Sequence, residues 1–413
     1  MKKIGCVVCV LFLCLITGCQ KTPDEVKKRM EQYGSHSKVE TQDGQYIKPS
    51  KVTASQKEAL QLKTQNLILP EEIHLGEWDK VYELSLHYME DFAEKRKDIA
   101  KLFTGQDIAW EYEANAESLV KDDDFYIYDN GEDCVLCTSD NGFASMNCGS
   151  VYQYTYHSEE GNGEYTLFDR NDEKALEQTM WNGKDASTVQ AEAAYMEQWM
   201  KEYWAGYEQP DFTYKVKNGM VYKDGGLELL SMTIQRYYEG VPFTSNGSEM
   251  AEDRKGKSYM ARTDAGILVG LTGENKVEYF SNLAGGLLVK DAVEVDKVID
   301  LATAIKLVEQ ELSGFKKLEV LDIVVQYDMF PKYQYKAPKG EKKEDCYGKG
   351  VKVFARPVYS FVLSKDVGNI DKPDYTINES EWYGYIDVDM QDGTIYCDLQ
   401  DVHYEGEDYG TAD

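Results

Sequence analysis

The order of predicted elements in the second half of the chain is the feature that most constrains the fold, because it occurs twice. Residues 187–285 and residues 295–400 each begin with a helical spacing of apolar residues, continue with an alternating strand pattern and close with a hairpin signal at a glycine. Helices that are followed by runs of strands are typical of α+β proteins. We therefore predict helices packed on antiparallel sheets, arranged as tandem repeats. Coincidence is the alternative, because a helix followed by strands is a common order.

The first copy, residues 187–285, opens with Ser187-Thr188-Val189-Gln190, which has the form of a capping box. Its helix is predicted to end at Gly206, and its closing hairpin is predicted around Asp264-Ala265-Gly266. The apolar positions that define its elements are Val189, Ala193, Met196, Met200 and Tyr203 in the helix, and Leu230, Met232 and Ile234 in the strand.

The second copy, residues 295–400, opens with Asp300 as the predicted helix cap, and Gly314 is the predicted helix end. Asp392-Gly393 lies between two alternating segments and is a strong signal for a hairpin turn. The apolar positions that define its elements are Leu301, Ile305, Val308 and Leu312 in the helix, and Ile323, Val325, Tyr327 and Met329 in the strand.

Three stretches of these copies resemble a known family. "YYEGVPF" (residues 237–243) and "ARPVYSFVL" (residues 355–363) are similar to the strand in which PepSY-type domains carry a Gly-Val-Pro or Pro-Val-Tyr step, and "YGYIDVDMQDGTIY" (residues 383–396) resembles their closing hairpin. The order of elements is also similar to that of Gram-positive extracytoplasmic regulatory proteins that sit beside a cell-wall histidine kinase. The resemblance implies binding or inhibitory modules and brings no catalytic residues. As a whole, the chain resembles uncharacterised lipoproteins of Gram-positive, Clostridia-like anaerobes.

The region before the repeats, residues 65–180, is predicted to contain one helix and an antiparallel meander. Apolar residues recur at helical spacing from Val81 to Leu102, and Gly105 is a suitable stop for that helix. Turn residues such as Asp129-Asn130-Gly131 separate short tyrosine-rich segments. The predicted strands are Ala109–Glu113, Phe125–Tyr128, Cys134–Thr138, Val151–Tyr156 and Tyr165–Phe168.

Residues 1–18 have the pattern of a lipoprotein signal peptide. Lys2 and Lys3 precede the apolar run Ile4–Ile16, which is too short for a membrane-spanning helix of roughly 20 residues. Ile16-Thr17-Gly18-Cys19 resembles a bacterial lipobox, so Cys19 is predicted to carry the lipid. This pattern predicts a protein that its lipid anchors to the extracytoplasmic face of the cell membrane. An ordinary signal peptide and a buried apolar strand are the alternatives.

Charge limits the partners that the chain can have. The formal net charge is −29, and such a surface repels nucleic acid and anionic headgroups. We therefore expect no nucleic-acid partner. The charge either keeps an exported protein soluble, which is the simpler interpretation, or favours a basic or cation-binding partner. Residues 19–64 are polar and predict a flexible tether, and residues 401–413 predict an acidic tail.

Cys134-Val135-Leu136-Cys137 has the spacing of redox and zinc sites, which need two thiols that face one point. Here the pair lies in a predicted strand, where residues three positions apart face opposite sides. We therefore favour neither redox nor zinc chemistry at this motif. A local disulfide between Cys148 and one of these two cysteines is a further alternative.

Asp387, Asp389 and Asp392 precede Gly393 and are the candidates for a metal site. Calcium loops place carboxylates at alternate positions before a glycine, because a tight turn aims their oxygens inward. The glycine comes one position later than in an EF-hand loop, and Asp398 stands where that loop needs a glutamate. We therefore favour an acidic hairpin without a metal, and we predict no cofactor.

The histidines, serines and glycines of the chain do not form any of the common catalytic motifs. We therefore predict a non-catalytic binding or regulatory protein that recognises a protein or peptide at the cell surface. The alternative is a cell-wall or carbohydrate-binding lipoprotein, in which Trp110, Trp181 and Trp382 would stack on sugar rings. Trp199 and Trp204 fall on the predicted helix of the first copy, and Trp199 is also a candidate core residue.

Overall fold

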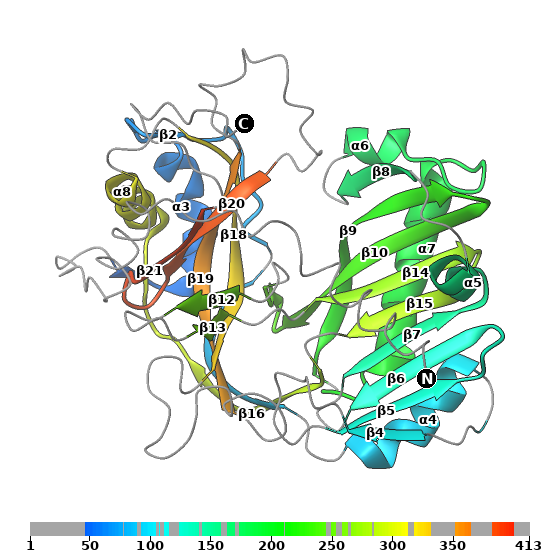
Figure 1. Cartoon of the computed structure of the whole chain (residues 1–413). Coiled ribbons are helices and arrows are strands. Elements are labelled where there is room, and N and C mark those ends of the chain that lie inside the picture. Colours follow the sequence, from blue (N-terminus) through cyan, green and yellow to red (C-terminus); the bar gives the residue numbers. More distant parts are fainter. Residues whose placement is uncertain are drawn as a thin grey trace, which may run out of the picture.

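The protein has an α+β fold with two large sheets that lie side by side (Figure 1). The structure is a computed structural model. None of its described helices combines the length and the apolar character that a membrane span needs. The described residues are 46–76, 78–88, 92–104, 107, 111–114, 124–139, 143–157, 163–169, 173–209, 211–244, 249–252, 258–262, 266–282, 285–312, 318–331, 352–364 and 382–399.

The larger sheet has ten strands in the order β4-β5-β6-β7-β15-β14-β10-β9-β8, with the short β11 paired to β10. The long strands β9 and β10 are joined at Gly225-Gly226, where φ angles of +52° and +94° require the freedom of glycine. The strands are β4 (Glu111–Ala114), β5 (Asp124–Asp129), β6 (Cys134–Ser139), β7 (Ala144–Cys148), β8 (Glu164–Asp169), β9 (Thr213–Asp224), β10 (Leu227–Tyr238), β11 (Val241–Pro242), β14 (Ile267–Gly273) and β15 (Lys276–Asn282).

Helix α7 (Ala186–Trp199) supplies one side of the core of this sheet. Asp185 caps it, since its carboxylate accepts a hydrogen bond from the Ser187 N–H at 3.1 Å, so the predicted cap at Ser187 is wrong by two residues. The π-helical turn η2 (Met200–Trp204) continues α7. The other helices of this part are α4 (Phe92–Thr104), α5 (Gly149–His157) and α6 (Glu173–Gln178).

The smaller sheet has seven strands, and β19 is its centre. One edge of β19 pairs with β18, while the other edge pairs with β3 through residues 352–355 and with β20 through residues 358–364. Helices α3 and α8 contact each other, and both belong to the side of the molecule that carries this sheet (Figure 1). The elements are β2 (Leu67–Ile68), β3 (Tyr82–Tyr88), β16 (Leu287–Glu294), α8 (Leu301–Glu311), β18 (Leu318–Pro331), β19 (Lys352–Ser364), β20 (Trp382–Asp389) and β21 (Ile395–Leu399).

The last residues of the predicted tether, 19–64, are folded. β1 (Tyr46–Ile47) pairs with β17 (Val298–Ile299), and η1 (Pro49–Lys51) leads into α3 (Val52–Ala59). Val52 and Ala59 are fully or almost fully buried in the common core. The tether prediction is therefore wrong from residue 46 onward. Val52 and Ala59 lie two turns apart on the same face of α3, and their small apolar side chains attach an otherwise polar helix to the core. Residues 19–45, the signal peptide 1–18 and the tail 401–413 lie outside the described residues.

The path of the chain differs from the predicted domain boundaries. Residues 46–88 and 285–399 together build the smaller sheet, which we call the seven-stranded unit. Residues 92–282 build the larger sheet, which we call the ten-stranded unit, and the small hairpin of β12 (Glu249–Glu252) and β13 (Ser258–Arg262), which contacts β18. The predicted region 65–180 is thus divided between two sheets, and the segment 187–285 shares its sheet with β4–β7. Long-range strand pairing, which local patterns do not contain, decides both boundaries.

Two predicted elements of the N-terminal region are wrong. The helix predicted from Val81 to Leu102 is strand β3 followed by helix α4, because Leu84 and Leu86 alternate into the core between β16 and β19. The strand predicted at Val151–Tyr156 is helix α5. Its first turn is stabilised by the Glu278 carboxylate, which accepts a hydrogen bond from the Ser150 N–H at 2.8 Å.

A helix followed by four antiparallel strands in sequential order occurs twice. In the ten-stranded unit α7 precedes β9, β10, β14 and β15, and in the seven-stranded unit α8 precedes β18, β19, β20 and β21. The detailed correspondence predicted from the sequence is wrong. Leu230–Ile234 lies in the second strand of its meander, since the first strand is β9, which was not predicted. The turn that closes the first meander lies between Gly273 and Lys276, whereas Gly266 precedes β14.

Candidate functional site

The predicted metal candidates lie around an arginine. The guanidinium Nη1 of Arg356 on β19 is 2.6 Å from Asp389 Oδ2 and 3.2 Å from Asp392 Oδ2. Asp392 also caps its own turn, since its Oδ1 accepts hydrogen bonds from the backbone N–H and the hydroxyl of Thr394. Asp387 is fully buried and lies opposite Ser360 on β19. A protein cation therefore sits among these carboxylates, and within the described residues no three acidic, histidine or cysteine side chains are arranged to hold a metal ion.

Two of these carboxyl groups have shifted pKa values of opposite sign. Burial raises the pKa of Asp389 from its ordinary 3.8 to about 7, against the opposing charge of Arg356. Burial also acts to raise the pKa of Asp392, but hydrogen bonds from Thr394 and the charge of Arg356 outweigh it, and the resulting pKa lies below the ordinary value. The hairpin thus contains one carboxyl group that holds a proton near neutral pH beside one that is ionised.

The two thiols of the C-x-x-C motif do not act together. Cys134 on β6 forms a disulfide with Cys148, its direct cross-strand neighbour on β7. Cys137 lies three residues along the same strand and is not part of this bond. The arrangement agrees with the alternative of a local disulfide.

Of the three tryptophans proposed as sugar platforms, Trp110, Trp181 and Trp382, the structure describes the side chain of Trp181 alone, and its burial disagrees with that proposal. Trp181 is fully buried, and Trp199 and Trp204 pack against Phe280 of the core sheet with small exposed fractions. Trp110 lies outside the described residues. Trp382 begins β20, and its side chain is also outside the described part. Stacking of a sugar on Trp181, Trp199 or Trp204 would require the core to open.

A groove of about 750 Å³ lies between the N-terminal segment of the seven-stranded unit and the turn that joins β10 to β11. This volume is in the range of sites for small molecules or short peptide segments. The groove is our candidate functional site. Its lining residues are Ser50, Thr53, Gly76, Trp78, Asp79, Lys80, Glu239 and Gly240.

One wall of the groove is the loop that leads into β3. The indole Nε1 of Trp78 donates a hydrogen bond to the Leu75 carbonyl at 2.6 Å, which turns the ring back over the loop. Gly76 lies between them with φ +89°, and a Cβ at this position would lie 3.3 Å from the indole Cδ1. Only glycine combines this backbone conformation with this close approach. Trp78 is therefore held in place, with 8% of its surface exposed.

The opposite wall is a two-residue turn. Tyr238 pairs with Val241, so that Glu239 and Gly240 form the loop between β10 and β11. Their φ angles are +50° and +84°, as expected of the type I′ turns that fit the twist of a hairpin. Glu239 is exposed, and its backbone has a positive φ, which is strained for a glutamate. This turn is the Glu-Gly step of the stretch "YYEGVPF".

The charges of the groove are unequal. Asp79 and Glu239 are acidic, while the Lys80 Nζ lies 2.7 Å from Glu294 Oε2 on β16. This hydrogen bond and the charge of Glu294 raise the pKa of Lys80, and Glu239 adds a smaller effect in the same direction. Lys80 is thus already matched by a carboxylate, and the groove retains an excess of negative charge.

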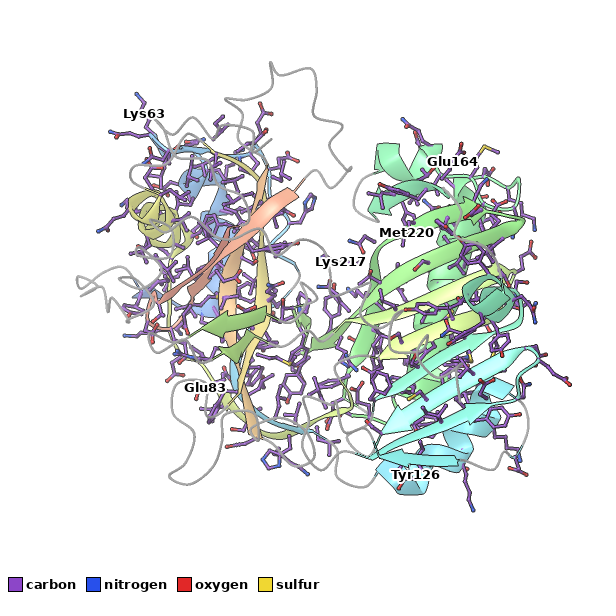
Figure 2. All side chains as sticks on the ribbon, in the orientation of Figure 1. Lys63, Glu83, Tyr126, Glu164, Lys217 and Met220 are labelled. Atoms are coloured by element: carbon purple, nitrogen blue, oxygen red, sulfur yellow. A yellow bond between two sulfur atoms is a disulfide. The ribbon has the colours of Figure 1, made fainter. Side chains whose placement is uncertain are left out.

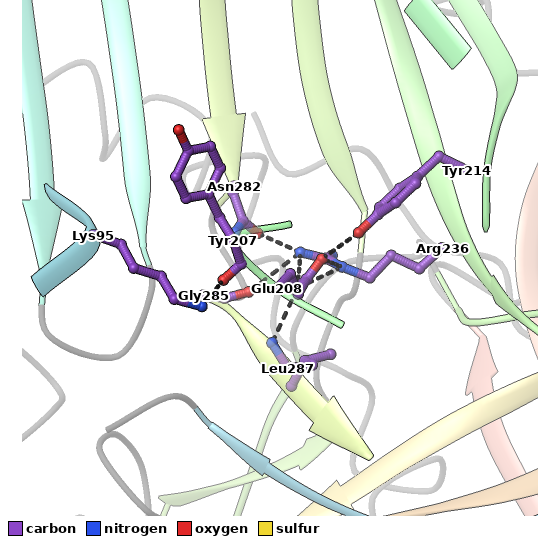
Figure 3. Close-up of polar contacts among 8 residues, drawn as sticks. All are labelled: Lys95, Tyr207, Glu208, Tyr214, Arg236, Asn282, Gly285 and Leu287. Atoms are coloured by element: carbon purple, nitrogen blue, oxygen red, sulfur yellow. Dashed lines mark hydrogen bonds and ion pairs between the residues drawn. The ribbon is translucent and has the colours of Figure 1, made fainter. Parts of the chain in front are cut away.

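A buried ion pair fixes the strand that carries the Glu239 turn, as Figure 3 shows. Arg236 of β10 has no exposed side-chain surface, and its Nε donates hydrogen bonds to both oxygens of Glu208 at 2.9 Å. Tyr214 O–H and Leu287 N–H also donate to Glu208, at 2.8 Å and 3.0 Å. Arg236 Nη2 donates to Asn282 Oδ1 at 2.8 Å and to the Gly285 carbonyl at 3.2 Å. We call this network the clasp, and it joins β10 to the first residue of β16.

Aromatic rings complete the junction between the two units. Tyr82 of β3 meets Tyr238 of β10 edge to face, with ring centroids 5.8 Å apart. Phe243 packs against Tyr327 of β18 at 5.3 Å, and the next N–H, that of Thr244, donates to the Tyr327 carbonyl at 2.9 Å. The Tyr327 hydroxyl in turn accepts a hydrogen bond from the Tyr82 N–H at 3.2 Å. Both walls of the groove are therefore tied to one packed interface.

The arrangement of the groove suits binding. It presents carboxylates, hydroxyl groups and a small part of an indole on its walls, and such convergent polar groups orient a ligand. The sequence analysis did not predict this site. Its residues come from three separate segments around residues 50, 78 and 239 that no local pattern connects. The one available signal was a Glu-Gly pair between two strand patterns, which predicts a tight turn.

Comparisons with known proteins give little further information. No protein-family model matches the chain, and no curated protein matches it. Among solved structures, the chain is similar to an uncharacterized protein from Eubacterium rectale ATCC 33656 at 14% sequence identity and a TM-score of 0.47, over 82% of this chain and 92% of that chain. A similarity of this size carries no argument about function.

Proposed function

We propose that the protein is a lipid-anchored, extracytoplasmic binding protein without catalytic activity, which recognises a segment of a protein or peptide in the groove between its two units. The observation that carries this proposal is the groove itself. Its walls come from two different sheets, and the clasp and the aromatic junction hold these sheets together. A preformed groove avoids part of the entropic cost of binding.

The proposed location is supported by two independent features. The first is the lipobox pattern that ends at Cys19. The second is the disulfide between Cys134 and Cys148, since such bonds persist in oxidising compartments outside the cytoplasm. Mass spectrometry of the N-terminal peptide of the mature protein is expected to find a lipid on Cys19. A Cys19→Ala variant that still partitions wholly into membranes would contradict the anchor.

A regulatory role is supported by the recurrence of a helix and a four-stranded antiparallel meander. This recurrence is compatible with the proposed PepSY-like repeats, for which the sequence resemblance implies binding or inhibitory modules. In this proposal the partner is a protein at the cell surface, and it binds in a groove that the N-terminal segment and the Glu239-Gly240 turn of the first repeat form together.

Site-specific crosslinking tests the proposed function. A photo-reactive p-benzoylphenylalanine replaces Thr53, an exposed residue of the groove lining, in the full chain within its own cells. The matched control carries the same group in place of Glu164 on the edge strand β8 (Figure 2), at the level of Glu228 and thus at the opposite end of β10 from Glu239. We expect a discrete, protease-sensitive adduct from position 53 and none from position 164.

The same experiment decides between the two classes of partner. An adduct that glycosidases remove and proteases leave intact would support the alternative, a cell-wall or carbohydrate-binding lipoprotein. Equal labelling from both positions, or none from position 53, would contradict recognition in the groove.

A further inference from the structure

We propose that the groove binds a cationic group, namely the side chain of a lysine or arginine in the recognised segment, between the carboxylates of Asp79 and Glu239 and beside the indole of Trp78. The inference rests on the proposed function, because it names the chemistry that the groove would recognise.

Charge balance is the first step of the argument. Among the residues that the structure describes, three charged side chains line the groove, and the ammonium among them, that of Lys80, lies 2.7 Å from a carboxylate outside the lining, Glu294 Oε2. This leaves Asp79 and Glu239 without an equal positive charge in the groove lining. A bound cation would balance this excess, whereas an anionic ligand would meet two carboxylates and gain only an ammonium that already has a partner.

The conformation of Glu239 is the second step. Among the described residues three side-chain-bearing positions have a positive φ, and they are Asn182, Glu239 and Asn275. Asparagine enters this region readily, whereas glutamate does so at a cost in free energy. Asn or Gly would form the turn better than Glu. The turn therefore presents a carboxylate to the groove at the expense of its own stability, which is the pattern expected of a binding residue.

The surroundings of the two carboxylates are the third step. Trp78 lines the same groove and is immobilised by its hydrogen bond to Leu75. With 8% of its surface exposed, Trp78 supplies a small apolar wall beside the carboxylates, against which the methylene stem of a lysine or arginine side chain can pack. The volume of about 750 Å³ leaves room for the residues that flank such a side chain.

The test is a titration of the full chain in detergent with two terminally blocked heptapeptides, followed by calorimetry. Each peptide contains six alanines and one central residue, which is lysine in one peptide and its uncharged isostere norleucine in the other. We expect the lysine peptide to bind at least about tenfold more tightly than the norleucine peptide, because partly desolvated charge pairs contribute on the order of 1 kcal/mol each. Glu239→Gln and Asp79→Asn are each expected to weaken the lysine peptide about three- to tenfold, with little effect on the other peptide.

A matched control separates the groove from the general charge of the protein. Since the chain carries a net charge of −29, a cationic peptide is attracted to the whole surface. Glu164→Gln removes one exposed carboxylate at the level of Lys223 and Glu228, at the opposite end of β10 from Glu239. We expect this variant to bind the lysine peptide as the unchanged protein does. An equal loss from Glu164→Gln and Glu239→Gln would overturn the inference.

The outcomes distinguish this inference from the proposed function. If position 53 yields its protein adduct but the two peptides bind equally, the groove recognises a protein without a cationic anchor, and the inference is wrong. If the peptide preference and its loss in Glu239→Gln are observed without any adduct, the cation site is supported and the proposed partner class is wrong.

Discussion

Each of the two units contains an arginine that meets carboxylates inside the protein, and the two surroundings differ. Among the described residues, the carboxylate that Arg236 meets in the clasp is that of Glu208, and both side chains have no exposed surface. In the seven-stranded unit, Arg356 keeps 24% of its side-chain surface exposed and meets the three carboxylates of Asp389, Asp392 and Glu83. One network is balanced in charge and dry, whereas the other has an excess of negative charge near water.

The two networks therefore have different roles: the clasp holds the two units together, whereas the carboxyl groups around Arg356 include one that binds a proton. The clasp pairs the Arg236 guanidinium with the Glu208 carboxylate and adds hydrogen bonds from Tyr214 and Leu287 to that carboxylate. Burial raises the pKa of Asp389, the most buried carboxyl group beside Arg356, against the charge of Arg356, and the charge of Asp392 adds to the rise. We therefore expect the ten-stranded unit and the clasp to respond to mutation, and the seven-stranded unit to respond to pH.

The largest expected effect comes from removal of the clasp arginine. Arg236→Met leaves the Glu208 carboxylate buried without its cation, and we expect a loss of about 3–5 kcal/mol in the free energy of unfolding. Urea unfolding followed by circular dichroism measures this loss.

Two further variants test the cause of that loss. Arg236→Met combined with Glu208→Gln removes the buried charge and keeps one carbonyl oxygen, which can accept from either Tyr214 or Leu287, so we expect part of the stability to return. Lys223→Met removes an exposed ion pair with Glu228 and is expected to cost less than about 1 kcal/mol. If the exposed pair proved as costly as the buried one, burial would not be the source of the difference.

The second effect belongs to the disulfide of the ten-stranded unit. Cys134 and Cys148 are separated by 14 residues, and a bridge across a loop of that size stabilises by about 3 kcal/mol because it restricts the unfolded chain. The double variant Cys134→Ala/Cys148→Ala is expected to unfold at a correspondingly lower urea concentration. A reducing agent should lower the stability of the unchanged protein and leave the variant unaffected. Equal sensitivity of both proteins would rule out the bridge as the cause.

The third effect is a pH dependence that arises in the seven-stranded unit. Asp389 has a pKa of about 7 in the folded state against an ordinary 3.8, so between these values the folded state binds more protons than the unfolded state. By linkage the stability contributed by this group is present below pH 4 and falls as pH rises to 7. Since one pKa unit corresponds to about 1.36 kcal/mol, we expect a loss of up to about 4 kcal/mol across this window.

Asp389→Asn is the matched variant for this effect. It cannot ionise, so the difference in stability between the variant and the unchanged protein is expected to shift in favour of the variant as pH rises from 4 to 7. Unfolding in urea at several pH values measures the shift. A constant difference across the window would show that Asp389 does not hold its proton in the folded state.

The smallest effect concerns the turn that ends β10. Glu239→Asn places a residue that favours positive φ in the type I′ turn, and we expect a gain of about 0.5–1 kcal/mol in stability. Asn275→Glu makes the reverse change in the β14–β15 turn, where Asn275 has φ +56°, and is expected to lose a similar amount. Thermal unfolding measures both. A destabilised Glu239→Asn variant would mean that the glutamate supports the fold and is not retained for binding.

Local patterns in the sequence predicted much of the secondary structure. The alternation of apolar residues located β10, β18 and β20, and Asp300 caps α8 as expected, since its carboxylate accepts a hydrogen bond from the Thr303 N–H at 2.7 Å. The α+β class with antiparallel sheets is also confirmed. These features depend on residues close in sequence, where hydrophobic periodicity and capping chemistry act directly.

The arrangement of the units and the groove was beyond such patterns. The N-terminal segment is polar on average, and its place depends on the contact of α3 with α8. The groove combines Thr53, Trp78 and Glu239, which become neighbours only when β3 pairs with β16 and β19. Composition predicted a tether where the structure has a helix, because an average over many residues conceals the few side chains that are buried.

The discontinuous path of the chain has a consequence for how the protein is made. Strand β3 is synthesised long before its two partners, β16 and β19, whereas the ten-stranded unit is complete once residue 282 has been added. The ten-stranded unit is therefore expected to fold first, while the apolar side of α3 and both edges of β3 wait for the C-terminal strands. During that interval the unpaired strand edges and apolar side chains of the N-terminal segment can aggregate, and a chaperone is expected to bind them.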